Sequence, residues 1–305
     1  MSSGLAGTLK GASLVKWIQL LVTGITMGSI YSLIALGYVT IYRTSRIVNM
    51  AQGAFVMFGG FFAYSLLSEV GLPYWLSAIL AIVAVMVLSG LMYLLVLKPL
   101  VKVSLVSIIL ATMALSILFE SFSLLRWGGY GKSVPAFSGD KALFVGKVAV
   151  FPQSLWVIGL MIVVLIGLWL LTNRTRIGKQ MTATANDPGA ASLSGVNTGR
   201  MIILAFAISA AIGALGGIAV SPINSTNYLS GGIYALSGFV AAILGGWGSS
   251  TGAVVGGLAL GIVQSLVTGF LPAGYQDAIA FAILILVLYF RPGGLVGAAS
   301  AEGEA

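Results

Sequence analysis

The chain has 305 residues, of which 59% are apolar and 7% are charged, and its mean hydropathy is +1.08. A soluble domain carries about 25% charged residues, so this composition indicates a helical protein embedded in lipid, and the scattered basic residues behind the net charge of +8 argue against nucleic-acid binding. The chain has no Cys and no His, which excludes disulfides, thiolate or imidazole metal sites and Ser–His or Cys–His catalysis.

Nine apolar segments are long enough, or nearly so, to cross a hydrocarbon core, which takes about 20 residues. In chain order they are Trp17–Tyr42, Ile47–Ser68, Trp75–Leu97, Val103–Leu125, Ser154–Thr172, Met201–Val220, Ile233–Gly245, Gly252–Phe270 and Tyr275–Phe290. The seventh is short and the ninth is marginal, so either could be tilted or re-entrant. The first is too long for a signal peptide, and we expect it to be retained. The sequence predicts an all-α polytopic transmembrane helix bundle of about eight to nine spans, with residues 1–305 forming one domain.

The basic residues predict the orientation of the chain. If all nine segments cross, nine Lys and Arg residues fall on one side and six on the other. The positive-inside bias then places the loop of residues 173–200 and the C-terminus in the cytoplasm. The N-terminus is expected outside.

The external loop of residues 126–153 alternates apolar and polar positions from Phe144 to Phe151, after a Ser138-Gly139-Asp140 turn. This pattern predicts a small β-hairpin. The same loop contains Arg126–Ser133, which ends in Gly-Lys-Ser as a phosphate-binding loop does. It lacks the first glycine and the strand-to-helix context of that motif, so we interpret the match as a coincidence. Any ATP would have to be hydrolysed by a partner.

The cytoplasmic loop predicts a short helix with its own start and stop signals. Asp187 is a natural N-cap, Pro188 suits the first helical position, and Gly195 suits a left-handed stop. Because a helix of about a turn and a half is unstable alone, we expect it to pack against another surface.

Small residues spaced four apart recur in the apolar segments and favour close helix packing. The pairs are Gly24/Gly28, Gly213/Gly217, Gly252/Gly256 and Gly257/Gly261. Packing within the chain is favoured over packing against a second subunit.

Polar residues in or beside the apolar segments are candidates for a translocation pathway, because such groups are costly in lipid. They are Asn49, Gln52, Glu120, Asn224, Asn227 and Gln264. Asn49 and Gln52 could instead cap the helix that re-enters the membrane. Glu120 could instead pair with Arg126 or with water.

Several stretches carry a family resemblance in their order along the chain. They are Gly24–Tyr38, Ile47–Gly53, Ala190–Thr198, Gly245–Ser249 ahead of Gly252–Gly257, and Arg291–Leu295. Together they resemble the permeases of branched-chain amino acid ABC transporters, and the length and opening are similar to the shorter, H-type subunit. Gln52 and Met50 stand where members commonly carry His and Phe, which leaves the substrate open.

The resemblance implies an ABC importer permease fold in the bacterial inner membrane, with branched-chain amino acids or related small solutes as substrates. The implied partners are a second related permease, two cytoplasmic ATPases that use ATP and Mg²⁺, and a periplasmic or lipoprotein binding protein that docks on the external loop. The chain itself would bind no cofactor or metal and would have no catalytic residues. The coupling region that docks on an ATPase would comprise Asp187, Pro188, Ala191, Ser192, Gly195 and Arg200.

Two other functions remain as alternatives. A stand-alone secondary transporter or channel for small polar solutes has no need of a capped docking helix, and a proton-driven carrier would usually bury more ionisable groups than Glu120. An intramembrane enzyme would lack plausible catalysts in a chain without His, without Cys and without a pair of membrane Asp residues.

Overall fold

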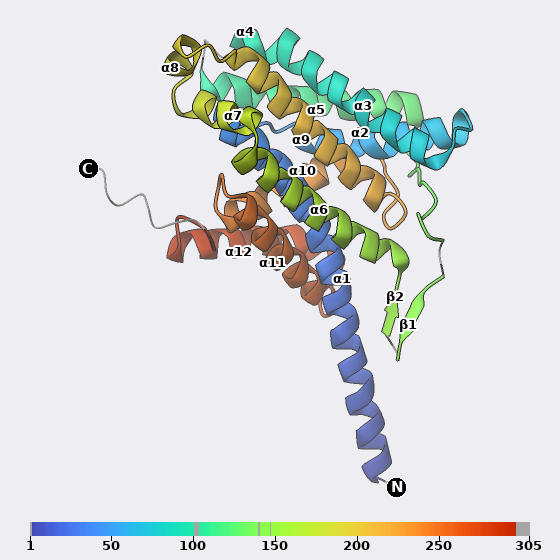
Figure 1. Cartoon of the computed structure of the whole chain (residues 1–305). Coiled ribbons are helices and arrows are strands. Elements are labelled where there is room, and N and C mark those ends of the chain that lie inside the picture. Colours follow the sequence, from blue (N-terminus) through green and yellow to red (C-terminus); the bar gives the residue numbers. More distant parts are fainter. Residues whose placement is uncertain (1, 101–103, 140, 147, 297–305) are drawn as a thin grey trace.

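The computed structural model describes residues 2–100, 104–139, 141–146 and 148–296 (Figure 1). The helices are α1 (Ser2–Ser45), α2 (Gln52–Tyr64), α3 (Tyr74–Met92), α4 (Lys98–Leu100), α5 (Leu105–Trp127), α6 (Pro152–Arg174), α7 (Arg176–Asn186), α8 (Pro188–Leu193), α9 (Thr198–Val220), α10 (Ser230–Gly245), α11 (Ser250–Thr268) and α12 (Gln276–Phe290). Two π-helical segments, η1 (Ser65–Glu69) and η2 (Tyr93–Leu97), continue α2 and α3, and η3 (Ala273–Tyr275) is a 3₁₀ turn. The strands are β1 (Leu143–Val145) and β2 (Val148–Val150).

Each of the nine apolar segments coincides with a helix, which confirms the all-α polytopic bundle. Within the described residues, six helices are long and apolar enough to cross a membrane. They are Val15–Ser45, Tyr74–Leu100, Val106–Trp127, Pro152–Arg174, Thr198–Val220 and Ser250–Thr268. The apolar helices Ser230–Gly245 and Ala278–Phe290 are shorter, so the predicted count of eight to nine spans is not confirmed. Val103, where one predicted span begins, lies outside the described residues.

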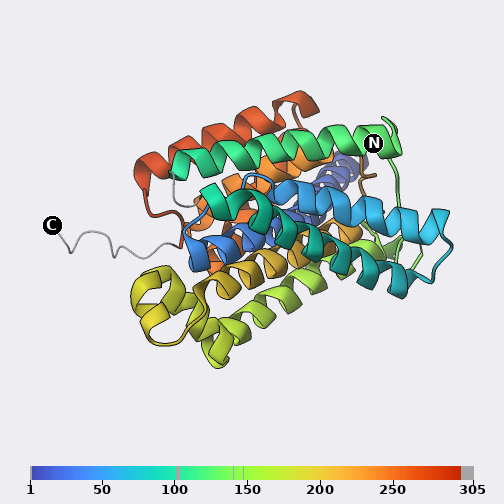
Figure 2. The ribbon, with the colours of Figure 1, turned by 90° about the horizontal axis from the view of Figure 1, so that it is seen from above.

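The helices form an inner and an outer set. The most apolar windows of α1 and α9 are 67% and 61% buried, whereas those of α3, α5 and α6 are only 28%, 22% and 17% buried. Figure 2 shows α5 and α6 on opposite outer sides of the bundle. The side chains that the outer helices leave exposed include Leu95, Ile117 and Val163, so this surface suits contact with lipid tails.

Glycine pairs let the inner helices approach closely. On α1 and α11, a Cβ added to Gly28 would lie 2.8 Å from the Leu258 Cα atom, and one added to Gly24 would lie 2.7 Å from the Ile262 Cα atom. Gly217 of α9 is pressed in the same way against Val56 of α2. The other pairs face helices of this chain as well, so the prediction of intramolecular packing is confirmed for all four.

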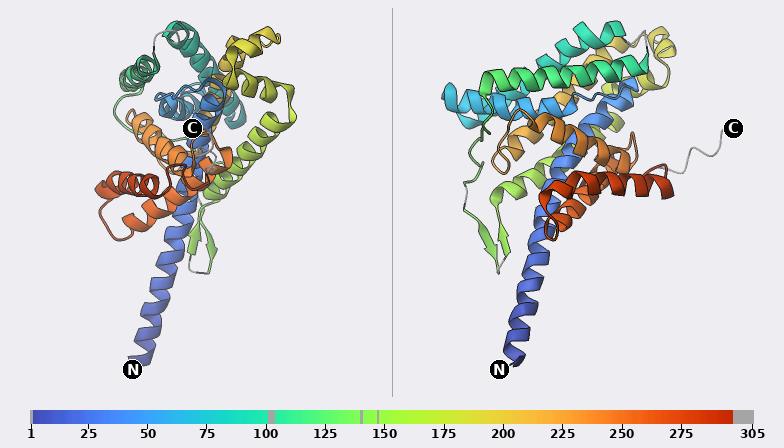
Figure 3. Two further views of the ribbon diagram at one scale, coloured as in Figure 1. Left: turned by 90° about the vertical axis from the view of Figure 1, so that its left-hand side faces the viewer. Right: turned by 180° about the vertical axis from the view of Figure 1, so that it is seen from behind.

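The two elements predicted in the loops lie at opposite ends of the molecule (Figures 1 and 3). The strands β1 and β2 pair antiparallel, with Leu143 opposite Val150 and Val145 opposite Val148, which confirms the hairpin. Asp140 of the predicted turn and the loop residue Lys147 lie outside the described residues. The helices α7 and α8 lie at the other end, and α7 packs beside the last turns of α1, where Arg43 and Met181 line one small pocket.

Two of the stretches that carry the resemblance meet in space. The corner of residues 245–249 joins α10 to α11, and the chain after α12 folds back onto it. The Leu295 amide donates to the Leu244 carbonyl at 2.8 Å, and the Val296 amide donates to the Gly245 carbonyl at 3.1 Å. Gly294 has a φ of 79°, and a Cβ on it would lie 2.5 Å from the Gly246 nitrogen, so close backbone contact requires glycine there.

Candidate functional site

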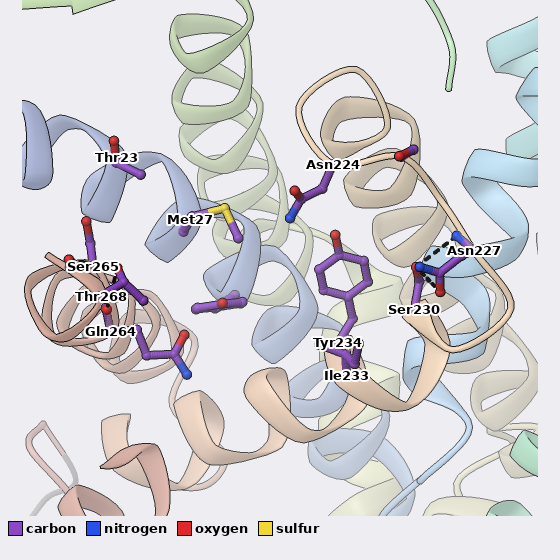
Figure 4. Close-up of a pocket in the computed structure, with 13 residues that line it drawn as sticks. Thr23, Met27, Asn224, Asn227, Ser230, Ile233, Tyr234, Gln264, Ser265 and Thr268 are labelled. Atoms are coloured by element: carbon purple, nitrogen blue, oxygen red, sulfur yellow. Dashed lines mark hydrogen bonds between the residues drawn. The ribbon is translucent and has the colours of Figure 1, made fainter. Parts of the chain in front are cut away.

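A polar cavity of about 510 Å³ lies between two walls of the bundle (Figure 4). Helices α1 and α11 form one wall, and α10 with the loop of residues 221–229 forms the other. The described lining residues are all uncharged: Thr23, Met27, Tyr31, Asn224, Ser225, Asn227, Ser230, Ile233, Tyr234, Gly261, Gln264, Ser265 and Thr268.

Helical spacing brings the lining of one wall together. Thr23, Met27 and Tyr31 are spaced by four along α1, so they share one face of that helix. Gln264 and Thr268 have the same spacing on α11. Among these residues the sequence predicted only Gln264. The polar stripe of Gln264, Ser265 and Thr268 on an apolar helix is a sequence signal that could have identified the lining of α11.

The cavity lies at the end of the bundle opposite α7 and α8. Its loop joins the last turn of α9 to the first turn of α10, whereas α9 begins beside α8. The segment after α5 is bonded to this loop, because Lys132 and Thr226 exchange two main-chain hydrogen bonds of 2.8 and 2.7 Å. The Ser133 hydroxyl also donates to the Ser221 carbonyl at 2.8 Å.

Most polar groups of the lining have identifiable partners. The Ser265 hydroxyl donates to the Leu20 carbonyl at 2.6 Å. The Asn227 side-chain oxygen accepts from the Leu229 amide at 2.9 Å and from the Ser230 hydroxyl at 3.2 Å, which fixes the start of α10.

Gln264 differs from its neighbours in the lining. Its side chain is 4% exposed, and its Oε1 atom has no hydrogen-bond partner in the part of the chain that the structure describes. Buried polar groups nearly always find a partner, so this unpartnered acceptor sets Gln264 apart from the rest of the lining.

The structure brings three of the six predicted pathway residues together. Asn224, Asn227 and Gln264 line the cavity, and Figure 4 shows Asn224 and Tyr234 pointing toward one another from the loop and α10. Asn49, Gln52 and Glu120 lie elsewhere, so the cavity does not unite the whole set.

Gln52 and Asn49 hold the backbone around α2. Gln52 is fully buried, and its Oε1 atom accepts from the Ser209 hydroxyl at 2.7 Å; the same hydroxyl lies 2.8 Å from the Gly37 carbonyl oxygen. Helices α2, α9 and α1 are thereby joined. The Asn49 Oδ1 atom accepts from the Ala51 amide at 3.1 Å and closes a turn just before α2, but neither Asn49 nor Gln52 caps that helix, whose N-cap residue is Ala51 without a side-chain hydrogen bond.

Glu120 faces α10 from the second half of α5. A Cβ added to Gly232 would lie 3.1 Å from its Oε1 atom, which places the carboxylate against the first turn of α10. The suggested pair with Arg126 is wrong, because Arg126 forms a 2.7 Å ion pair with Glu69 at the end of η1. About 1.7 helical turns separate Glu120 from Arg126, so their side chains leave α5 in different directions.

The predicted helix of the cytoplasmic loop is present as α8, with the expected signals. The Asp187 carboxylate accepts from the Gly189 amide at 2.8 Å and the Ala190 amide at 3.0 Å, and Pro188 is the first helical residue. At the other end Gly195 has a φ of 80°, its amide donates to the Ser192 carbonyl, and the next amide donates to the Ala191 carbonyl, both at 3.0 Å. This is the Schellman arrangement that ends a helix with glycine.

The side chains of the predicted coupling region fall on different surfaces. Ala191 is buried, Ser192 is exposed with its hydroxyl bonded to the Gly189 carbonyl, and Arg200 lies in the first turn of α9. Leu193, which was not predicted, is 91% exposed at the end of α8. Only the structure shows that this side chain points outward.

The profile of the family described as "Branched-chain amino acid transport system / permease component" matches residues 20–288, nearly the whole chain. The chain belongs to this permease family. It is 31% identical to the high-affinity branched-chain amino acid transport system permease protein BraD of Pseudomonas aeruginosa, over 94% of this chain and 97% of that protein. It is 28% identical to the corresponding permease LivH of Escherichia coli, with the same coverage.

Two further permeases are similar as well. The chain is 29% identical to a probable branched-chain amino acid transport permease of Methanocaldococcus jannaschii, over 87% of this chain and 88% of that protein. It is 24% identical to the ribose import permease RbsC of Escherichia coli, over 85% and 81% of the two chains. No solved structure gave a significant match.

Proposed function

We propose that this permease is the membrane-spanning subunit of an ATP-driven ABC importer that takes up branched-chain amino acids or related small solutes. The family match over residues 20–288 and the names of the similar permeases support the transport role. The capped helix α8 is the observation that favours an ATP-driven machine, because a short helix closed at both ends and bearing an exposed leucine is suited to docking.

In this proposal α7 and α8 lie in the cytoplasm and couple the permease to two ATPases. Asp187, Pro188 and Gly195 shape the docking helix, Ala191 seats it, and Ser192 and Arg200 lie near the contact. The hairpin end lies outside, with the N-terminus, and receives a binding protein. The C-terminus is cytoplasmic, and this chain crosses the membrane eight to nine times. A second permease completes the pore.

The mechanism requires no chemistry in this chain. Closure of the ATPases would move α8, and a two-state bundle would then expose the pathway alternately to either side. Asn224, Asn227 and Gln264 belong to the outer part of that pathway. Gln52 and Asn49 hold the inner helices in register, and Glu120 braces α5 against α10.

Purification of the tagged permease from its native membrane tests this proposal. We expect two ATPases and a second permease to copurify, and uptake by the reconstituted complex to require ATP and a binding protein. Uptake by the lone chain without ATP would instead support the alternative of a secondary transporter or channel.

A further inference from the structure

We propose that the cavity between α1, α10 and α11 is a solute-binding site in the permease itself, and that its uncharged polar lining selects small solutes of zero net charge. This inference rests on the proposed transport function, because it treats the cavity as an intermediate binding site on the translocation pathway. It goes further by giving the permease a selectivity of its own.

The unpartnered oxygen of Gln264 is the first observation that points to a ligand. The side chain is 4% exposed, and it extends from α11 into the space that Asn224 and Tyr234 border from the opposite wall (Figure 4). A buried acceptor without a donor is unfavourable, and this oxygen is covered by its neighbours, so we expect the amide to turn toward the cavity when a solute offers a donor. Gln52 shows the contrast, because its oxygen is already bonded to Ser209.

The charge of the lining indicates the class of solute. The described lining residues are all uncharged, and they offer both acceptors and donors through amide and hydroxyl groups. The ammonium and carboxylate of a zwitterion can be bonded by such groups while their charges offset one another. A solute with a net charge would enter a low-dielectric site without a counterion, which is far more costly.

Size and polarity fit the same class of solute. The cavity of about 510 Å³ falls within the range of about 300–1,000 Å³ typical of small-molecule sites. Met27 and Ile233 add apolar surface among the polar groups, so an aliphatic side chain can be accommodated beside a polar head.

A single-cysteine experiment measures solute binding directly, because the natural chain has no Cys. Thr268→Cys places a thiol on the lining, and Ser138→Cys places a matched thiol on the outer loop. Both variants are reconstituted as full transporters without the binding protein and labelled with a small uncharged thiol reagent. Leucine at ten times its dissociation constant should slow labelling of Thr268→Cys about ten-fold. It should leave Ser138→Cys unchanged, and lysine and glutamate should protect neither.

Gln264→Glu tests the origin of the selectivity, because it keeps the shape of the side chain and adds one negative charge. In the Thr268→Cys background it should abolish protection by leucine and produce protection by lysine. The same exchange at Gln180 on α7, outside the cavity, should change neither result.

Leucine that protects Thr268→Cys no better than Ser138→Cys would overturn the site. Equal protection by leucine, lysine and glutamate would overturn the selection against charge. Failure of the proposed function would appear separately, as uptake that does not require ATP, whereas failure of the site alone would leave ATP-driven uptake intact and protection absent.

Discussion

Gly195 ends α8 in a backbone conformation, with φ of 80°, that side chains other than glycine and asparagine rarely adopt. A β-branched residue there would cost about 1–2 kcal/mol and would open the Schellman turn. We therefore expect Gly195→Val to abolish solute-stimulated ATP hydrolysis by the assembled transporter while membrane insertion is unchanged. Gly195→Asn, which tolerates the same conformation, should retain most of the activity. Normal stimulation in the valine variant would contradict a coupling role for α8.

Leu193 offers a second test at the same helix. It is 91% exposed, so Leu193→Ser removes few contacts within the chain and should change the melting temperature of the isolated permease little. If the side chain inserts into an ATPase groove, copurification of the ATPases should fall by about ten-fold, as expected for loss of 1–2 kcal/mol at an interface. Ile177→Ser on α7, at a residue that is 43% exposed, is the matched control. ATPase recovery equal to wild type in Leu193→Ser would rule out this contact.

At the scale of helices, the seam between α1 and α11 depends on glycine. A Cβ at Gly257 would lie 2.5 Å from the Ser32 nitrogen and 2.7 Å from its Cα atom, and backbone cannot move aside easily. We expect Gly257→Ala to destabilise the permease by about 1–3 kcal/mol, seen as a lower melting temperature in detergent. Gly90→Ala on α3 meets nothing within 4 Å and should be neutral or stabilising. Equal melting temperatures for the two variants would show that the seam tolerates side chains.

The helices and the short coupling element follow from local signals in the sequence. Apolar length marks the helices, and α8 is specified by Asp187, Pro188 and Gly195, whose chemistry acts within a few residues. These features need no knowledge of what packs against them. The hairpin is similarly local, because its strands are neighbours in the chain.

The cavity could not be predicted in the same way. Gln52 and Gln264 are both buried amides in apolar helices, yet one is bonded across the bundle to Ser209 and the other lines the cavity with an unpartnered oxygen. Which of these occurs depends on the rotation and contacts of helices far apart in the sequence. The pairing of Arg126 with Glu69, 57 residues away, escaped prediction for the same reason.

At the scale of the whole molecule, the separation of α8 and the hairpin to opposite ends gives a direct test of orientation (Figure 3). In intact cells, Ser138→Cys on the outer loop should react with a membrane-impermeant thiol reagent. Ser192→Cys on α8 should react only after the membrane is opened. The cysteine-free wild type provides the blank. Labelling of Ser192→Cys in intact cells would reverse the proposed orientation.

The paired main chains of Lys132 and Thr226 join the segment after α5 to the rim of the cavity, since Thr226 lies between Ser225 and Asn227 of the lining. A displacement of the backbone at Lys132 is therefore transmitted to Thr226 at the cavity rim, and the reverse also holds. A partner that moved the cavity rim through Lys132 would change the free energy of solute in the cavity, and by reciprocity the solute would then change the partner's affinity by the same factor. Binding of the solute in the cavity and release of the protein that delivered it would then be thermodynamically linked.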